Sequence, residues 1–252
     1  GNEPHLDSES IINNLFCHRM KKLLKIGGVL LGLLLLGLLV FLWARHEPLP
    51  EGKTGPEADA LAQKMLKALN FEAYRQTRYL EWSYRNGKNQ YLWDKDLGHV
   101  TVRWDDIRVD LNLNDPAKSS VTKNGKQMDQ AQKEKEVSAA LKNFNNDSFW
   151  LVAPFKVFDS GTTRSIVSLG NGEKGLLVTY ASGGTTPGDS YLWLLNEDGF
   201  PNAYKMWVNI IPIGGVMASW DDWMVVDSGA FLPKSHQLGP LTLNMGDVKG
   251  YN

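Results

Sequence analysis

One uninterrupted apolar segment constrains this chain more than any other feature of its sequence. Residues 26–44 read I-G-G-V-L-L-G-L-L-L-L-G-L-L-V-F-L-W-A and contain no charged side chain. At about 1.5 Å of rise per helical residue they span about 28 Å, close to the roughly 30 Å of a bilayer hydrocarbon core. A helix buried in a soluble core normally keeps a polar stripe toward solvent, and this segment has none. The sequence therefore predicts one transmembrane helix from Ile26 to Ala44.

The charges beside this segment predict its orientation. Four basic side chains precede it: Arg19, Lys21, Lys22 and Lys25. Arg45 alone follows it directly. Because Lys and Arg concentrate on the cytoplasmic side of membrane helices, we expect residues 1–25 to be cytoplasmic. The C-terminal part is then expected in the periplasm of a bacterial cell, tethered to the inner membrane.

Two interpretations of the segment stay open, an uncleaved signal anchor and a cleavable signal peptide. The run is longer than the usual signal-peptide core of about 7–15 residues, and its end, L-W-A-R-H-E, does not resemble an A-x-A-like cleavage site. Both features favour the anchor. Met20-Lys-Lys looks like a start of translation, which makes residues 1–19 a candidate upstream extension.

Cysteine, charge and histidine content exclude several classes of function. The single cysteine, Cys17, precedes the membrane segment, so the exported part is expected to have no disulfide, thiolate metal site or cysteine nucleophile. A net charge of −1 gives no sign of a nucleic-acid partner. The two histidines beyond the linker, His99 and His236, lack zinc-enzyme spacing, so no metal and no cofactor is expected.

The sequence after the anchor predicts a Pro- and Gly-rich linker over 45–56. Beyond the linker, its hydrophobic spacing predicts helices and strands. Apolar residues at helical spacing predict a helix over 58–69. Alternating apolar and polar residues over 78–113 predict a four-stranded antiparallel meander. A second helix is expected over 128–145, followed by a packed connector at 146–158.

Strands are expected to return in the last third of the chain. The better candidates are Thr163–Leu169, Gly175–Ala181, Ser190–Leu195, Ala203–Ile210, Trp220–Val226 and Leu241–Val248. No domain boundary is visible after Pro56, so residues 57–252 are expected to form one domain. Its class is α+β and mainly antiparallel, with one continuous, curved and unclosed sheet wrapped around a few helices.

The search for catalytic motifs yields one weak candidate. Gly188-Asp-Ser190 is similar to the nucleophile segment of one esterase family, but it opens an alternating strand instead of joining a strand to a helix. The Gly-x-Ser-x-Gly elbow is also missing from the sequence. A non-catalytic domain is therefore expected, and a hydrolase site around Ser190, Asp189 and His236 is kept as an alternative.

Tryptophan is the most distinctive residue of the predicted domain. Eight tryptophans follow the linker, and several occupy alternating strand positions on the face that should be buried. They indicate either a sheet core packed on the helices or a concave aromatic surface that holds an apolar ligand such as an acyl chain. The residues predicted to bind that ligand are Trp82, Tyr84, Trp93, Trp104, Trp193 and Trp207.

The order of these elements resembles the lipoprotein-carrier-like (LolA/LolB/LppX-like) fold of bacterial envelope proteins. The segments that carry the resemblance are Ala58–Leu69, Arg78–Leu113, Asn146–Pro154, Thr179–Tyr191 and Gly199–Trp207. In that fold an unclosed sheet wraps helices around a hydrophobic cavity, and its members bind and transfer lipids or acylated proteins. The resemblance implies a tethered domain that binds a lipid or acyl chain. The alternative is an envelope structural or protein-interaction module with a filled core.

Overall fold

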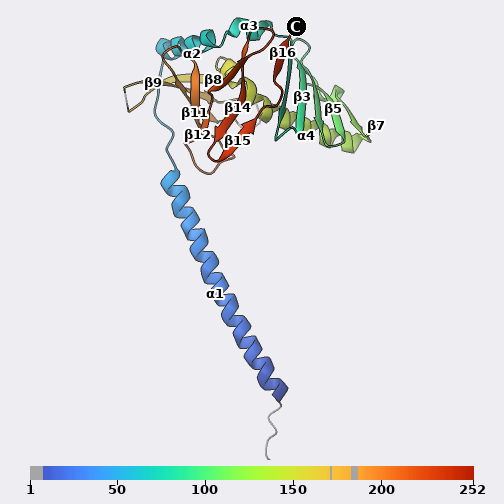
Figure 1. The fold of residues 1–252 in the computed structure, drawn as a ribbon, viewed down its shortest axis with the longest axis vertical. Helices are drawn as coiled ribbons and strands as arrows, with labels where there is room; N and C mark the ends of the chain where they lie inside the picture. Colours follow the sequence, from blue (N-terminus) through green and yellow to red (C-terminus); the bar gives the residue numbers. More distant parts are fainter. Residues whose placement is uncertain (1–7, 171, 183–186) are drawn as a thin grey trace, which may run out of the picture. The chain divides into compact units, whose positions relative to one another are not determined.

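The computed structural model of the chain describes residues 8–170, 172–182 and 187–252 (Figure 1). It divides into two compact units, the first ending at Glu47 and the second running from Pro48 to Asn252. The boundary lies inside the expected linker over 45–56. The first unit contributes one long helix, and the second contains the strands that the structure describes.

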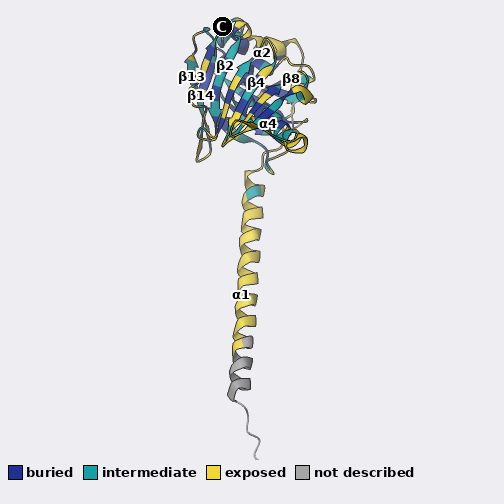
Figure 2. Ribbon diagram, turned by 90° about the vertical axis from the view of Figure 1, so that its right-hand side faces the viewer, coloured by how far each residue is buried: buried dark blue, intermediate teal, exposed yellow. Residues whose placement is uncertain are grey.

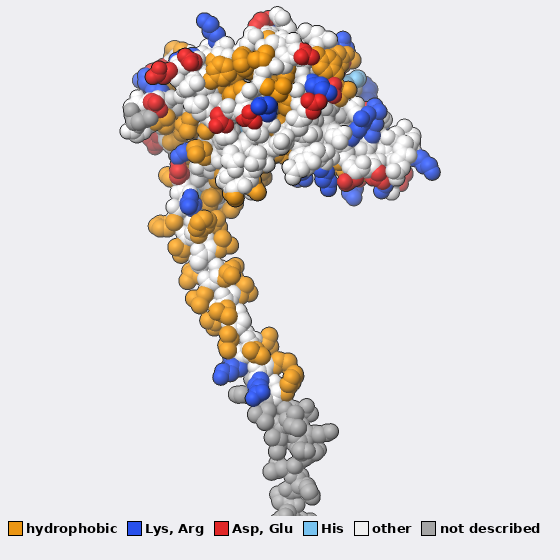
Figure 3. All heavy atoms as spheres, viewed as in Figure 1, with side chains coloured by type: hydrophobic (Ala, Val, Ile, Leu, Met, Phe, Trp, Pro, Cys, Tyr) orange, Lys and Arg blue, Asp and Glu red, His pale blue; other side chains and the backbone are white. Residues whose placement is uncertain are grey.

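The first unit is formed by α1 (Ser8–Arg45). Within it, Arg19–Arg45 is long and apolar enough to cross a membrane. Figure 2 shows nearly all of the described side chains of this helix as exposed, and Figure 3 shows apolar side chains along its described part. The helix predicted over 26–44 is thus confirmed as one that can span a membrane by length and composition, properties that a signal sequence shares.

The second unit contains α2 (Pro56–Ala68), α3 (Phe71–Gln76) and α4 (Gln130–Val152). Pro56 occupies the first turn of α2, where a backbone N–H would have no helical partner. Asp129 caps α4, because its carboxylate accepts a hydrogen bond from the backbone N–H of Gln132 at 2.9 Å. Two short 3-10 turns also occur, η1 and η2, and they span Pro116–Lys118 and Ala153–Lys156.

The helix α4 is longer than the sequence indicated. The helix expected over 128–145 continues through Val152, so the first half of the connector expected at 146–158 is helical. Asn146-Asp-Ser148 suggested a helix end because Asn, Asp and Ser favour caps and turns. In the structure Asp147 and Ser148 are buried on the inner face of the helix instead. Pro154 follows in η2, where the α-helix has ended.

One sheet has seven strands in the order β16-β2-β3-β4-β5-β6-β7, with antiparallel neighbours throughout. Its strands are β2 (Tyr79–Tyr84), β3 (Asn89–Asp94), β4 (His99–Trp104), β5 (Ile107–Asn112), β6 (Ser120–Lys123), β7 (Lys126–Gln127) and β16 (Lys249–Tyr251). The four-stranded meander predicted over 78–113 is confirmed as β2 to β5. The hairpin β6–β7 and the C-terminal strand β16 extend it on either side.

The other sheet follows the order β1-β8-β9-β10-β11-β12-β14-β13, and β15 also pairs with β14. Its strands are β1 (Lys53–Thr54), β8 (Thr162–Ser168), β9 (Lys174–Tyr180), β10 (Ser190–Leu195), β11 (Pro201–Trp207), β12 (Val216–Ser219), β13 (Asp222–Val225), β14 (Phe231–Leu238) and β15 (Leu241–Asn244). Three of these strands, β1, β12 and β14, were not predicted. β1 lies inside the expected linker, and Pro233 interrupts the alternation of β14.

Met245 lies where the two sheets meet. Its backbone N–H donates to the carbonyl of Lys234 at 2.9 Å, and its carbonyl accepts from the backbone N–H of Ser83 at 2.9 Å. These bonds join the end of β15 to β2. The prediction of a mainly antiparallel α+β fold with unclosed β structure is confirmed. The single continuous sheet expected from the sequence is instead two sheets that adjoin at this edge.

The hydrophobic core lies between the helices and one face of each sheet, and Figure 2 shows buried residues along the strands. The alternation predicted for β2 is realised, because Leu80, Trp82 and Tyr84 are buried while the residues between them are half-exposed. Met65 of α2 and Phe144 of α4 belong to the same cluster of buried side chains. The buried aromatic residues of β2 therefore share one core cluster with side chains of α2 and α4.

Candidate functional site

The structure separates the six residues predicted to bind a ligand into two groups. Trp82, Tyr84 and Trp193 are buried in the main core, and Trp93 and Trp104 are half-buried against it. Trp207 instead joins a small separate cluster, whose buried members are Val167, Leu177 and Leu192. Tyr204 and Met206 of β11 face the main core, so the alternation of a strand directs Trp207 to the opposite face of the sheet.

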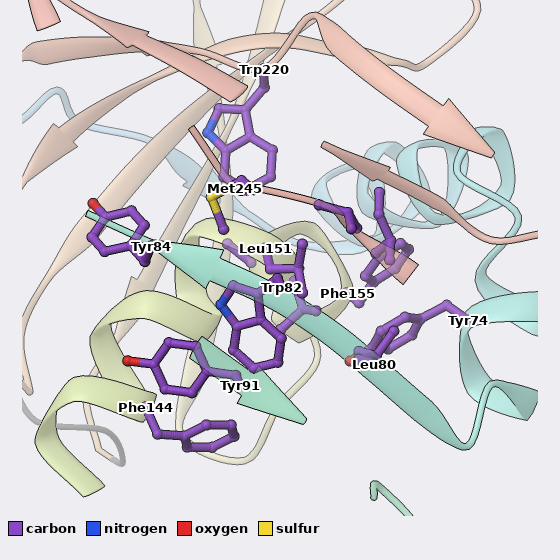
Figure 4. Packing of buried hydrophobic residues seen from close by; sticks show 14 of the residues in the cluster. Tyr74, Leu80, Trp82, Tyr84, Tyr91, Phe144, Leu151, Phe155, Trp220 and Met245 are labelled. Carbon is purple, nitrogen blue, oxygen red and sulfur yellow. The ribbon is translucent and has the colours of Figure 1, made fainter. Parts of the chain in front are cut away.

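The first aromatic group of the interior lies between β2, β3 and α4. The Trp82 ring stacks on Tyr91 with centroids 4.6 Å apart, and Phe144 of α4 contacts both rings. Trp93 meets the edge of Phe144 at 5.2 Å. Figure 4 shows Trp82, Tyr91 and Phe144 turned toward one another. Phe144 therefore occupies the space that a ligand on these strands would need.

The second aromatic group lies where the C-terminal end of α4 meets the larger sheet. Trp193 contacts Tyr204 at 5.1 Å and Trp220 at 5.0 Å between ring centroids. Trp150 of α4 lies 5.7 Å from Tyr204 and 5.3 Å from the imidazole of His236. Like the first group, these rings are in contact with one another, and helix α4 covers them.

The aromatic interior is thus packed, whereas a concave aromatic surface for a ligand was one of the two expectations from the sequence. Two depressions stand out on the described surface, and both are open to solvent. One of about 330 Å³ lies between the β6–β7 hairpin and the start of α4. The other, of about 300 Å³, lies along β2, β3 and β4 beside polar residues such as Glu81 and Gln90, and Trp82 and Tyr91 border it.

Several buried polar atoms of the aromatic interior have no hydrogen-bond partner among the described residues. They include the indole nitrogens of Trp82, Trp93 and Trp193 and the hydroxyl of Tyr180. Burial raises the pKa of Tyr180 well above its ordinary value, which keeps the hydroxyl protonated. Leaving a buried donor unpaired costs about 1–3 kcal/mol, so most native proteins pair such groups or hydrate them.

A buried carboxylate fixes α4 to the smaller sheet. Asp147 of α4 accepts hydrogen bonds from the Tyr91 hydroxyl at 2.5 Å and from the Asn89 amide at 2.8 Å, both on β3. The Asn146 amide donates to its other oxygen at 2.8 Å. Burial and the nearby Asp147 carboxylate raise the pKa of Tyr91, so the phenol remains a donor. We call this group the Asp147 clamp.

A buried imidazole fixes the end of α4 to the larger sheet. Both ring nitrogens of His236 face backbone carbonyls, Nε2 that of Trp150 at 2.7 Å and Nδ1 that of Ser219 at 2.8 Å. The Trp150 carbonyl has no helical donor because the residue four positions later is Pro154, which lacks an N–H. Burial lowers the pKa of His236, and the two carbonyls, which an imidazolium could satisfy together, oppose that effect. We call this group the His236 clamp.

The three residues of the hydrolase alternative, Ser190, Asp189 and His236, each have other hydrogen-bond partners in the structure. The Ser190 hydroxyl lies 2.8 Å from the hydroxyl of Thr179. The Asp189 carboxylate accepts from the backbone N–H of Asn209 at 2.9 Å, and His236 uses both nitrogens in its clamp. A general base must reach the nucleophile's proton, and both nitrogens of His236 face backbone carbonyls instead of the Ser190 hydroxyl. In the described residues no group of three or more His, Cys, Asp and Glu side chains could hold a metal.

Sequence reasoning missed the two clamps, although one of them left a signal. Ala140, Phe144, Asp147 and Leu151 recur at i, i+4, i+7 and i+11, which puts Asp147 on the buried face of a continuous helix. Taking 146–148 as a helix end concealed that spacing. The His236 clamp left no comparable pattern, because its two acceptors are backbone carbonyls of Trp150 and Ser219.

Comparison with known proteins does not assign this site. In the site, α4 and the strands bring together aromatic rings, unpaired donors and the two polar clamps. None of these features indicates one particular reaction. Inference about function therefore starts from the geometry. The chain matches no protein-family model and no curated protein sequence.

Proposed function

We propose that this chain is a membrane-tethered, non-catalytic domain that binds an amphiphilic ligand between α4 and the inner faces of its two sheets. The unpaired donors of the aromatic interior carry the proposal. Trp82, Trp93 and Trp193 bury indole N–H groups without an acceptor among the described residues. A ligand whose oxygens reached them would recover about 1–3 kcal/mol for each donor that it paired.

The surroundings of these donors define the class of ligand. The lining is aromatic and aliphatic, which suits an acyl chain. Indole N–H groups donate and do not accept, so the polar end of the ligand should carry acceptors such as ester, carboxyl or phosphate oxygens. A fatty acid, a phospholipid or the acylated end of a protein has this combination. This ligand class is the one that the resemblance to lipoprotein carriers implies.

Access to the interior requires α4 to move, since Phe144 and Trp150 occupy the space. The Asp147 clamp and the His236 clamp hold this helix through a small number of polar contacts. Release of both, together with withdrawal of Phe144 and Trp150 from their ring contacts, would let α4 lift from two sheets that are not closed on each other. A ligand that binds only the open form would then shift the population toward it.

The tether completes the proposal. The stretch Arg19–Arg45 is long and apolar enough to cross a membrane. We propose that it is not cleaved and remains as the membrane anchor. The basic residues that precede it favour a cytoplasmic N-terminus and an extracytoplasmic second unit. In a bacterial cell this arrangement puts the ligand-binding unit in the periplasm at the inner membrane. A tethered unit suits local lipid handling better than diffusion between membranes.

A second candidate function is favoured by the packing itself. The rings of Trp82, Tyr91 and Phe144 are in mutual contact, as a permanent core would be. In that case the unit is an envelope structural or protein-interaction module, and its binding surface lies outside the core. The two candidates differ in whether an acyl ligand enters the interior.

Native mass spectrometry of the unit from residue 48 to 252, expressed in bacteria and gently purified, tests the choice. We expect a bound lipid on the native unit and a several-fold lower occupancy in Trp193→Phe, which removes an unpaired donor from the interior. Trp207→Phe is the matched control, because Trp207 lies in the separate cluster. Absence of lipid even after incubation with oleate or phosphatidylglycerol would favour the filled-core module.

A further inference from the structure

Two neighbouring hairpin ends of the second unit expose aliphatic side chains. Ile210 in the β11–β12 loop is 71% exposed, and Met217 at the start of β12 is 54% exposed. Leu241 at the β14–β15 turn is 59% exposed. We call these three residues, with the exposed Pro212 and Pro240 beside them, the apolar tip.

The strand register brings the parts of the apolar tip together. Ala218 of β12 pairs with Leu238 of β14, so the start of β12 and the β14–β15 turn lie at the same end of the sheet. Figure 1 likewise shows β12 and β15 close together. No Asp, Glu, Lys or Arg occurs over 208–220 or 235–245. The two segments therefore carry no charged side chain of their own, although Lys205 of β11 is the cross-strand partner of Met217. Because Ala218, Leu238 and Leu241 share one face of the sheet, Met217 projects to the other, and the tip presents aliphatic side chains on both sides of this end of the sheet.

Hydrogen bonds fix the loop that presents Ile210. The backbone N–H of Asn209 donates to the Asp189 carboxylate at 2.9 Å, and the Asn209 amide donates to the carbonyl of Pro187 at 3.1 Å. The N–H of Ile211 bonds to the carbonyl of Val208 at 3.1 Å. Since these bonds hold the residues on either side of Ile210, its exposure is a property of a folded loop. A preordered apolar loop loses little conformational entropy on binding.

We propose that the apolar tip docks on the lipid bilayer that α1 crosses, an inference that rests on the proposed tether. Residues 46–52 are the chain between α1 and β1. Seven residues reach at most about 25 Å when extended, at roughly 3.3–3.6 Å per residue. The bilayer is therefore always within the range of the second unit, which makes docking an intramolecular event with a high effective concentration.

The chemistry of the tip selects lipid over a protein partner. Three exposed aliphatic side chains present far less than the roughly 800 Å² per partner that a stable protein interface buries. Aliphatic residues without charge can enter the boundary between headgroups and acyl chains. Binding driven in this way depends on apolar area and not on anionic lipid, so salt should have little effect on it. Docking would also hold the proposed ligand-binding unit next to a source of acyl lipid.

Site-specific fluorescence on the full chain in vesicles tests the docking. Replacement of the only cysteine by Cys17→Ser allows one environment-sensitive dye to be attached at Ile210→Cys. Asp96→Cys, on the exposed β3–β4 turn, provides a matched control position. We expect a blue-shifted emission at position 210, with at least fivefold more quenching by doxyl-labelled phosphatidylcholine than at position 96. Adding Leu241→Asp should reduce the quenching at position 210 at least threefold.

The outcomes separate the docking from the tether. The quenching should be equal in vesicles of phosphatidylcholine with and without one-fifth phosphatidylglycerol. Co-flotation of the chain with the vesicles but no quenching at position 210 overturns the docking and leaves the tether standing. Failure to co-float removes the tether, and the docking falls with it. A blue shift without doxyl quenching means that the tip is buried against protein, which also overturns the proposal, as does equal quenching at positions 210 and 96.

Discussion

Removal of one hydroxyl from the Asp147 clamp is a sharp test of how α4 is held. In Tyr91→Phe the ring remains and can keep its stacking on Trp82, but Asp147 loses the donor at 2.5 Å. Asp147 is 1% exposed, so water does not readily replace the hydroxyl. A hydrogen bond to a charged group contributes about 1.5–3 kcal/mol. We expect the free energy of unfolding to fall by about 2 kcal/mol, since the amides of Asn89 and Asn146 still donate to the carboxylate.

Tyr180→Phe makes the same chemical change where no bond is lost. The Tyr180 hydroxyl is buried without a partner among the described residues, so its removal should leave stability unchanged or raise it by up to about 1 kcal/mol. Urea unfolding of the unit from residue 48 to 252 measures both variants, with equal m-values showing that the same surface unfolds. Thermal unfolding should show a midpoint about 4–8 °C lower for Tyr91→Phe. Equal losses in the two variants, or no loss in Tyr91→Phe, would refute the assigned role of the hydroxyl.

Two further predictions concern pH and the seam between the sheets. Burial lowers the pKa of His236 from 6.5, so below about pH 6.5 the unfolded chain binds more protons than the folded one. The free energy of unfolding should be highest above that pH and fall on acidification toward pH 5. In urea unfolding, His236→Gln should flatten this part of the pH profile. A native profile that is already flat from pH 7 to 5 contradicts the prediction. Gly246→Ala would put a Cβ 2.0 Å from the Ser83 hydroxyl at a positive φ, whereas Gly87→Ala also has a positive φ but meets open space. Calorimetry should show Gly246→Ala less stable than Gly87→Ala by at least about 1 kcal/mol, and equal stabilities would rule out tight packing at the seam.

Local patterns in the sequence predicted the elements that local interactions determine. The alternation over 78–113 holds at most strand positions, with Asn89 buried and Leu92 exposed as exceptions, and Asn86-Gly87 supplies the positive φ angles that a tight hairpin needs. Its strands pair with their sequence neighbours, so the turns fix the register. The apolar stretch 26–44 is similarly self-sufficient, because a helix satisfies its own backbone hydrogen bonds.

Elements that depend on distant partners were beyond the reach of these patterns. The strand β14 contains Pro233, which lies opposite Trp223 at a register shift, and its pairing with β12, β13 and β15 stabilises a segment of weak alternation. β16 pairs with β2 from the far end of the chain. Whether the strands form one sheet or two depends on such pairings and on the bonds made by Met245.

The candidate site shows the same division between what is local and what is not. The alternation of β2 predicts which face of the sheet Trp82 lies on. It does not predict that Phe144 of α4 contacts the Trp82 ring. Trp207 shares its strand face with Lys205, which suggests an outward position even before the register is known. That Tyr204 lies opposite Trp193 requires the pairing of β10 with β11, which no single-strand pattern contains.

The distribution of polar contacts along α4 reconciles a packed interior with a ligand-binding role. Its N-terminal half is mostly polar and largely exposed, whereas Asp147 and the Trp150 carbonyl make buried contacts to different sheets. Each clamp joins the helix to only one sheet, so loss of one leaves α4 attached at the other side. Each step of such an opening releases the polar contacts to one sheet, at about 1.5–3 kcal/mol for a hydrogen bond to a charged group, while the apolar side chains of α4 leave the core. A variant that weakens the Asp147 clamp, such as Tyr91→Phe, should therefore bind acyl ligands faster if the interior is their site.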